Sequence, residues 1–290
     1  MTMITSTNGF TTGELVDLSS EIVKLGVTHT PFTSLLLSKG SVNKAMSTVY
    51  SWIEKTVDDT DDITFAEGSK TDEFQKTVKR ELSNILQIFK KATEVSGTAE
   101  AMQSTLMSQE VADRLLELKM NLENTLINGI KDDGSSTGIR RMSGLIESRD
   151  TANDIGGAHP FDVIKQGMEK LWDSKLAPTG EFYAFMNAGV KEQLDNEFVD
   201  SYSYAHVNTN FGLQVQTLNT NFGVVHVVLS RYIPEKQIVL FNEAYTDIVT
   251  LRNAHFEPLA KTGDAVRGQV VGEYSLKVAS PKAVALLKLI

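Results

Sequence analysis

The strongest periodic pattern in the chain lies between Ser108 and Asn128, where apolar residues recur at helical spacing. This spacing predicts an amphipathic helix of about 31 Å, because residues three or four positions apart share one face. Ser108 suits the N-cap, Glu110 suits the first turn, and Gly129 suits a left-handed residue at the end. The residues expected to form its buried face are Val111, Leu115, Leu118, Leu122 and Leu126.

Two other stretches alternate with a period of two, which is typical of β-strands. The longer stretch runs from Val270 to Ala279. The shorter stretch runs from Val49 to Val57. It places Tyr50, Trp52 and Glu54 on one side of the strand and Val49, Ser51 and Ile53 on the other. The chain is therefore expected to combine helices with strands.

The amino end divides at Thr30. Thr30 suits a helix N-cap and Pro31 the first helical position, and Gly40 is expected to end this helix. Residues 1–27 are polar and rich in Thr, Ser and Gly, with one short apolar stretch. We expect them to form an N-terminal tail, because they hold too few apolar residues for a core of their own.

Residues 160–241 predict a small α+β unit. Helices are expected to begin at Pro160 and after Asn187. Strands are expected at Glu181–Met186, Leu213–Leu218, Val224–Leu229 and Ile238–Phe241. The apolar face of the first helix is expected to hold Ile164, Met168, Leu171 and Trp172. Polar loops at Lys131–Gly138 and Asp150–Gly157 are the expected domain junctions.

The segment from Ser47 to Val95 is acidic in its first half and basic from Lys76 to Lys91. This reversal predicts a long two-stranded arm that lies against a neighbour, because an isolated ribbon is marginally stable in water. Tyr50 and Trp52 fit either a core or an interface. The interface is slightly favoured, because no partner sheet lies near them in the sequence. The suspected inter-subunit contacts are Tyr50, Trp52, Asp58, Asp59, Asp61, Asp62, Lys79, Arg80, Lys90 and Lys91.

Composition and charge limit the possible classes of protein. The chain has 290 residues and no cysteine, which excludes disulfides, thiolate metal sites and cysteine nucleophiles. We find neither a signal peptide nor a stretch of about 18 apolar residues for a membrane span. The net charge of −9 argues against binding of nucleic acid through its phosphates. It is compatible with enclosing DNA, because an acidic wall does not adhere to the phosphates.

The sequence contains no pattern that predicts catalysis. It lacks a phosphate-binding glycine loop, a dinucleotide fingerprint, a zinc-protease motif and a nucleophile elbow. Asp58 to Asp62 lack the glycine and glutamate spacing of a calcium loop, and His226 is expected to be a satisfied sheet residue. We therefore expect no catalytic residue, metal or cofactor. A hydrolase whose triad assembles only in space is the enzyme alternative.

Several short motifs are spread along nearly the whole chain. They are Thr30-Pro31-Phe32, Trp52-Ile53-Glu54, Gln87-Ile88-Phe89, Leu118-Lys119 with Glu123, Asn221-Phe222-Gly223, the run Leu259-Ala260-Lys261-Thr262-Gly263-Asp264, and Glu273-Tyr274-Ser275-Leu276. With this ordered set, the chain resembles one group of tailed-bacteriophage major capsid proteins, which have the Hong Kong 97 type fold. The resemblance implies an α+β fold in four parts. These are an N-arm at 1–43, an E-loop hairpin at 44–98, a peripheral domain at 99–155 and 246–290 with the long helix as its spine, and an axial domain at 156–245.

The resemblance also implies a structural function. Subunits would form hexamers and pentamers that close into an icosahedral shell around double-stranded DNA. The implied locations are the virion and, during assembly, the host cytoplasm, and scaffolding, portal and decoration proteins would be further partners. An encapsulin, which shares the fold, is the alternative shell protein. Lys70 or Lys76 would be suitably placed for a cross-link between subunits, but no local pattern marks its asparagine or glutamate.

Overall fold

The computed structural model describes residues 30–56, 64, 67–68, 70, 77–98, 107–176, 179–201, 216–260 and 263–290. The helices are α2 (Pro31–Ser38), α4 (Met107–Asn128), α5 (Pro160–Asp173) and α6 (Ala188–Ser201), with short 3-10 helices η1 (Thr151–Asn153), η2 (Glu243–Tyr245) and η3 (Pro281–Ala283). The strands are β1 (Val42–Lys44), β2 (Val49–Thr56), β3 (Val78–Ile85), β4 (Gln87–Ser96), β5 (Ile155–Gly157), β6 (Phe182–Met186), β7 (Thr217–Thr220), β8 (Gly223–Leu229), β9 (Gln237–Asn242), β10 (Thr246–Leu259), β11 (Ala265–Val278) and β12 (Val284–Leu289).

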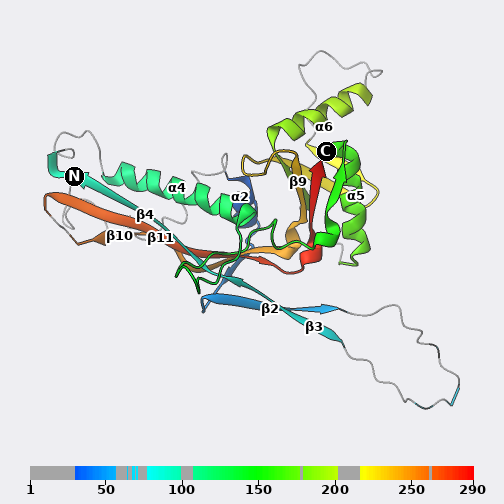
Figure 1. Cartoon of the computed structure of the whole chain (residues 1–290), viewed down its shortest axis with the longest axis horizontal. Helices are drawn as coiled ribbons and strands as arrows, with labels where there is room; N and C mark the ends of the chain where they lie inside the picture. Colours follow the sequence, from blue (N-terminus) through cyan, green and yellow to red (C-terminus); the bar gives the residue numbers. More distant parts are fainter. Residues whose placement is uncertain are drawn as a thin grey trace.

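These elements form a four-stranded sheet, a six-stranded sheet and a separate two-stranded ribbon. Figure 1 shows α4 lying along β4, β10 and β11 at one end of the molecule, and α5, α6 and β9 at the other. Strands β2 and β3, which we call the ribbon, project away from both sheets. The molecule is therefore elongated, with α2 near its middle.

The four-stranded sheet has the order β1-β10-β11-β4, and α4 packs against β4 and β11. Helix α4 has 22 residues, begins at Met107, and places Ser108 inside its first turn. The apolar stripe read from the sequence faces the sheet. Its members Val111, Leu115, Leu118, Leu122 and Leu126 are all buried.

The end of α4 differs from the expectation of a left-handed glycine, since Gly129 has no positive φ. Gly129 is instead required by a close approach of two backbones. A Cβ atom there would lie 2.7 Å from the Met142 carbonyl oxygen, and Gly144 N donates to the Gly129 oxygen at 2.8 Å. A side chain would separate the helix end from the segment that returns beside it.

Strands β10 and β11 form a hairpin of 14 residues in each strand, about 46 Å long at the usual rise. Both faces of β11 are covered. One face, with Val270, Tyr274 and Leu276, joins the main core, while Ser275 on the other face is 0% exposed and Glu273 is 4% exposed. Glu273 accepts hydrogen bonds from Arg140 and Arg252, each at 3.1 Å, so its buried charge is neutralised.

The six-stranded sheet has the order β5-β12-β9-β6-β8-β7. Its central strands are buried on both sides: Phe185 and Phe241 face the main core, while Ala184 and Leu240 face α5. This explains the apolar runs in the sequence. The expected face of α5 is buried except for Trp172, which is 58% exposed beside Phe222. Strand β7 begins at Thr217, and the earlier part of the predicted Leu213–Leu218 strand lies outside the described residues.

Helix α2 starts at Pro31 and ends before Gly40, whose φ of 70° is the expected left-handed conformation. The Thr30 side chain makes no capping hydrogen bond, although Thr30 occupies the N-cap position. The cap comes instead from Glu123 on α4. The tail expected at residues 1–27 lies outside the described residues.

The second limb of the predicted arm is divided between two sheets. The ribbon pairs Val49 with Ile85 at its root and Thr56 with Val78 at its far end. After Leu86 the chain enters β4, which pairs with β11 in the four-stranded sheet. The basic segment from Lys76 to Lys91 is thus not one return limb. The chain changes sheets where Leu86 is fully buried against Ala45 and Val249.

Candidate functional site

The ribbon has two unlike faces, and one of them is fastened to its own subunit. Trp52 Nε1 donates a hydrogen bond to the Ala279 carbonyl oxygen at 3.2 Å. Ser280 Oγ donates to Glu54 Oε1 at 2.5 Å. Ala279 and Ser280 both lie in the connection between β11 and β12, so this connection holds the face of the ribbon that carries Trp52 and Glu54.

Tyr50 lies on the same face as Trp52, and the two ring centroids are 6.1 Å apart. Tyr50 also packs against a small cluster formed by Ala45, Leu86 and Val249. Both aromatic residues therefore have partners within their own subunit. This arrangement matches the core alternative, and their part in contacts between subunits stays a prediction.

Asn84 holds the root of the ribbon and is 2% exposed. Its Nδ2 group donates to the carbonyl oxygens of Ser143 at 2.9 Å and Leu276 at 2.6 Å. Its Oδ1 atom accepts from the backbone N–H groups of Ile85 and Ser143. One side chain thus joins β3, β11 and the loop after α4. Sequence reasoning missed Asn84, because a single asparagine in a strand forms no recognisable pattern.

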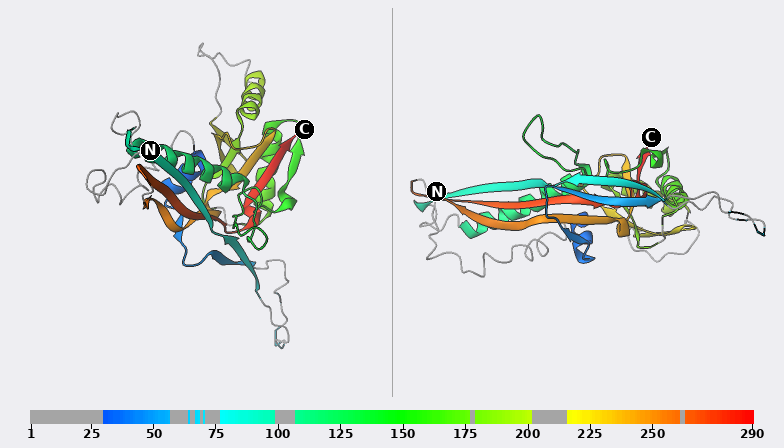
Figure 2. Two further views of the ribbon diagram at one scale, coloured as in Figure 1. Left: turned by 60° about the vertical axis from the view of Figure 1, so that its left-hand side comes forward. Right: turned by 90° about the horizontal axis from the view of Figure 1, so that it is seen from below.

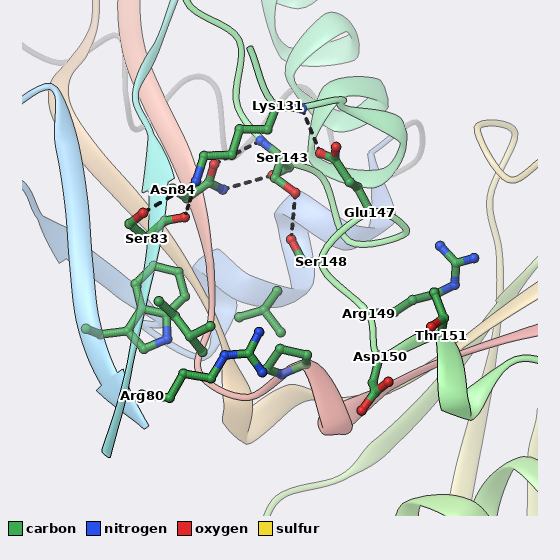
Figure 3. A pocket seen from close by; sticks show the side chains of 14 residues that line it. Arg80, Ser83, Asn84, Lys131, Ser143, Glu147, Ser148, Arg149, Asp150 and Thr151 are labelled. Carbon is green, nitrogen blue, oxygen red and sulfur yellow. Dashed lines mark hydrogen bonds between the residues drawn. The ribbon is translucent and has the colours of Figure 1, made fainter. Parts of the chain in front are cut away.

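A cavity of about 440 Å³, lined by both polar and apolar side chains, lies between the ribbon and the loop after α4 (Figure 3). Lys131 lies across it, and its Nζ atom donates to the Ser83 carbonyl oxygen at 2.7 Å. Ser143 and Ser148 join their hydroxyl groups at 2.9 Å along one wall. The ribbon is therefore held to the rest of the subunit by the hydrogen bonds of Asn84 and, separately, by the contact of Lys131 with Ser83.

The other face of the ribbon is uncovered. Val49 is 49% exposed and Ile53 is 63% exposed, although both are apolar. Two lysines, Lys55 and Lys79, stand directly opposite each other on this face. Like charges at opposed positions destabilise an isolated strand pair. Val49 and Ile53 were not among the suspected contacts, although the alternation had placed them together opposite Tyr50 and Trp52.

The other charged residues suspected of inter-subunit contacts are scattered. Arg80 lies exposed on β3, and Lys90 lies exposed on β4. Lys91 forms an ion pair with Glu117 of its own α4 at 3.4 Å. Asp58, Asp59, Asp61 and Asp62 lie outside the described residues, as does Lys76. The described residues therefore do not test whether the acidic and basic groups pair, and their pairing stays a prediction.

The described parts of the chain bring no metal-binding set together. Among those residues no group of three or more His, Asp or Glu side chains could hold a metal ion. His226 lies on β8 with its ring 5.2 Å from that of Tyr183 and its Nε2 atom 3.7 Å from Glu181 Oε2. No described helix is long and apolar enough to cross a membrane.

Solved structures with the same fold are shells. The capsid subunit of cyanophage A-1(L) superposes with a TM-score of 0.69 at 12% identity, covering 90% of this chain and 93% of that one. The capsid of cyanophage P-SCSP1u gives 0.62 at 11% identity, covering 86% of both chains. The SrpI encapsulin from Synechococcus elongatus gives 0.54 at 14% identity, covering 85% and 84%. The fold is therefore of the Hong Kong 97 type, as expected.

The family is established from the sequence of the whole chain. The family model described as SU10 major capsid protein matches residues 5–290. The chain therefore belongs to this family of major capsid proteins, which confirms the expected relation to phage heads. No curated protein matches the chain.

Proposed function

We propose that this protein is the shell subunit of a phage head, assembling as hexamers and pentamers into an icosahedral shell around double-stranded DNA. Membership of the SU10 major capsid protein family supports a capsid role. Assembly would take place in the host cytoplasm and end in the virion. The single observation that carries the contact between subunits is the uncovered face of the ribbon.

This exposed face has the properties expected of a surface that another subunit covers. A two-stranded ribbon alone is marginally stable in water. Here one face is fastened to the subunit, while Val49 and Ile53 on the other face are 49% and 63% exposed. A neighbouring copy that covers Ile53 and supplies an acidic group to Lys55 and Lys79 would remove both the apolar exposure and the repulsion. A second copy is the partner that a shell provides.

The charge of the chain supports enclosure of DNA without sequence-specific binding. With 28 Lys and Arg against 37 Asp and Glu, the subunit carries a net negative charge at neutral pH. A wall of this charge would repel phosphates and leave the packaged DNA free to move. The proposed function is structural and uses no catalytic residue.

Deletion of residues 58–72, bridged by a short Gly/Ser linker, tests whether the segment that joins β2 to β3 is needed for shell assembly. We expect a cooperative thermal unfolding transition by circular dichroism and loss of closed shells by negative-stain microscopy. As a control, the same linker in place of residues 135–138, in an exposed loop, should leave shells intact. Normal shells from the deletion variant would show that residues 58–72 make no essential lattice contact, while substitution of Ile53 tests the open face itself. If the unaltered protein stays strictly monomeric at high concentration, with and without a scaffolding protein, the shell function itself fails.

An encapsulin-type compartment is the second candidate, because the SrpI encapsulin shares the fold. The two candidates differ in content. A phage head should contain long double-stranded DNA that a nuclease cannot reach, whereas a compartment should contain a cargo protein. Nuclease treatment of purified particles, followed by gel electrophoresis of nucleic acid and protein, separates them.

A further inference from the structure

Helix α2 lies between the two sheets, and its middle is packed against the six-stranded one. Phe32 is 0% exposed, and its ring makes edge contacts with Phe185 at 5.7 Å and Phe241 at 5.3 Å between centroids. Leu36, one turn further, is 1% exposed in the same core. Apolar packing therefore holds the body of the helix, while its two ends depend on charged groups.

The N-terminal end of α2 is capped by a glutamate of α4. Glu123 of α4 accepts hydrogen bonds from Phe32 N at 2.8 Å, Thr33 N at 2.7 Å and Thr33 Oγ1 at 2.6 Å. These N–H groups have no partner inside their own helix. Burial raises the pKa of Glu123 above its usual range, and the hydrogen bonds from Thr33 and Phe32 and the nearby charge of Lys119 oppose this shift. The cap thus comes from a residue some 90 positions along the chain.

The second end is bound to the six-stranded sheet. Lys39 Nζ contacts Glu181 Oε2 at 3.1 Å and forms a shorter ion pair with Glu243. Burial opposes the charge of Lys39, but the hydrogen bonds to Glu243 and Glu181 raise its pKa above the usual value. Tyr183 donates to Glu181 Oε2 at 2.7 Å, and burial together with this bond raises the pKa of Tyr183 to about 12.

The buried charge of Glu243 is balanced by Lys39. Glu243 is 9% exposed, and its Oε2 atom is buried without a hydrogen-bond partner. A buried carboxylate without a cation is costly, so removal of Lys39 would leave an uncompensated charge next to η2. His226 is the other basic group near this cluster, and its Nε2 atom lies 3.7 Å from Glu181, not from Glu243.

We propose that α2 is a two-ended clasp that holds the four-stranded and six-stranded sheets in one relative orientation. Glu123 ties its first turn to α4, and Lys39 ties its C-terminal end to Glu181, just before β6, and to Glu243 of η2. The inference concerns the single subunit and does not rest on the proposed shell function.

The absence of cysteine allows a direct measurement of this orientation. Asp113 on α4 and Lys170 on α5 are exposed, and both can be replaced by cysteine and spin-labelled. In dispersed subunits carrying Lys39→Met we expect a broader distance distribution between the labels. The amide protons of α2 should also exchange about tenfold faster, because hydrogen bonds to charged groups are lost. The double variant Lys39→Met with Glu243→Gln should recover much of the narrow distribution.

The control is Lys165→Met, which removes an exposed lysine of α5 outside the clasp and should change neither readout. Glu123→Gln tests the first end and should broaden the same distribution. Should that variant fail to fold, Lys39→Met alone decides the matter. An unchanged distance distribution in Lys39→Met would overturn the clasp. Because no assembly is involved, this result would leave the shell function standing.

Discussion

The molecule contains two antiparallel hairpins that differ in how far the rest of the subunit covers them. In β11 of the β10–β11 hairpin both faces are covered, by α4 on one side and by Arg140 and the root of the ribbon on the other. In the ribbon of β2 and β3 one face is fastened and the other is open. The right view of Figure 2, seen from below, shows the long strands β10, β11 and β4 running side by side toward the end marked N.

The difference teaches that the same local structure can serve a core or an interface. Tyr274 and Leu276 of β11 are buried inside the subunit, whereas Val49 and Ile53 of β2 are exposed apolar side chains. A hairpin whose second face stays apolar and uncovered is suited to burial by another chain. Substitutions on each hairpin should therefore separate folding of the subunit from assembly of subunits.

The largest effect is expected where α4 covers the long hairpin. Leu118 is 1% exposed, so Leu118→Asp would place an unpaired charge in the core and cost about 4–5 kcal/mol of unfolding free energy. We expect insoluble protein, measured by the soluble fraction and urea unfolding. Met120→Asp on the same helix is the control, because Met120 is 36% exposed. An unchanged melting temperature for Leu118→Asp would show that the stripe is not a core face.

A smaller effect is expected at the root of the ribbon. Asn84→Ala removes four hydrogen bonds from a buried side chain and should cost about 2–3 kcal/mol, since buried partners are left unsatisfied. Amide exchange should speed up in β2 and β3 more than in β10. The control is Ser83→Ala, because the Ser83 hydroxyl makes only a 3.4 Å contact with Lys131. Equal acceleration in both hairpins would mean that Asn84 supports the whole subunit.

The smallest effect on folding is expected on the open face. Ile53→Asp should change the unfolding free energy by less than about 0.5 kcal/mol, because Ile53 is largely exposed, yet it should prevent closed shells. Trp52→Ala should lower stability more and weaken shells less, since Trp52 supports the ribbon from its own subunit. Ile139→Asp, at a loop position 58% exposed, is the matched control and should assemble normally. Normal shells from Ile53→Asp would remove this face from the lattice.

Part of the fold was readable because one face of an element repeats a simple period. The five apolar positions of α4 are buried as the stripe predicted, and most of the strands after residue 180 occur where the apolar runs placed them. The pattern failed at single residues whose surroundings are set by the packing of other elements. Trp172 has the right spacing for the buried face of α5 but lies exposed at its end. Gly129 has the right position for a left-handed end but serves a close backbone approach.

The sequence by itself determined the family, the spine helix, the alternating strands and the acidic character of the subunit, because these depend on local periodicity, ordered motifs and composition. Only the tertiary structure decided which face of β2 is open, because alternation separates two faces without saying which one meets a partner. It also brought Glu123 to Phe32 and Asn84 to Ser143. Such contacts join residues far apart in the chain. They depend on how the sheets pack, which no spacing in the sequence records.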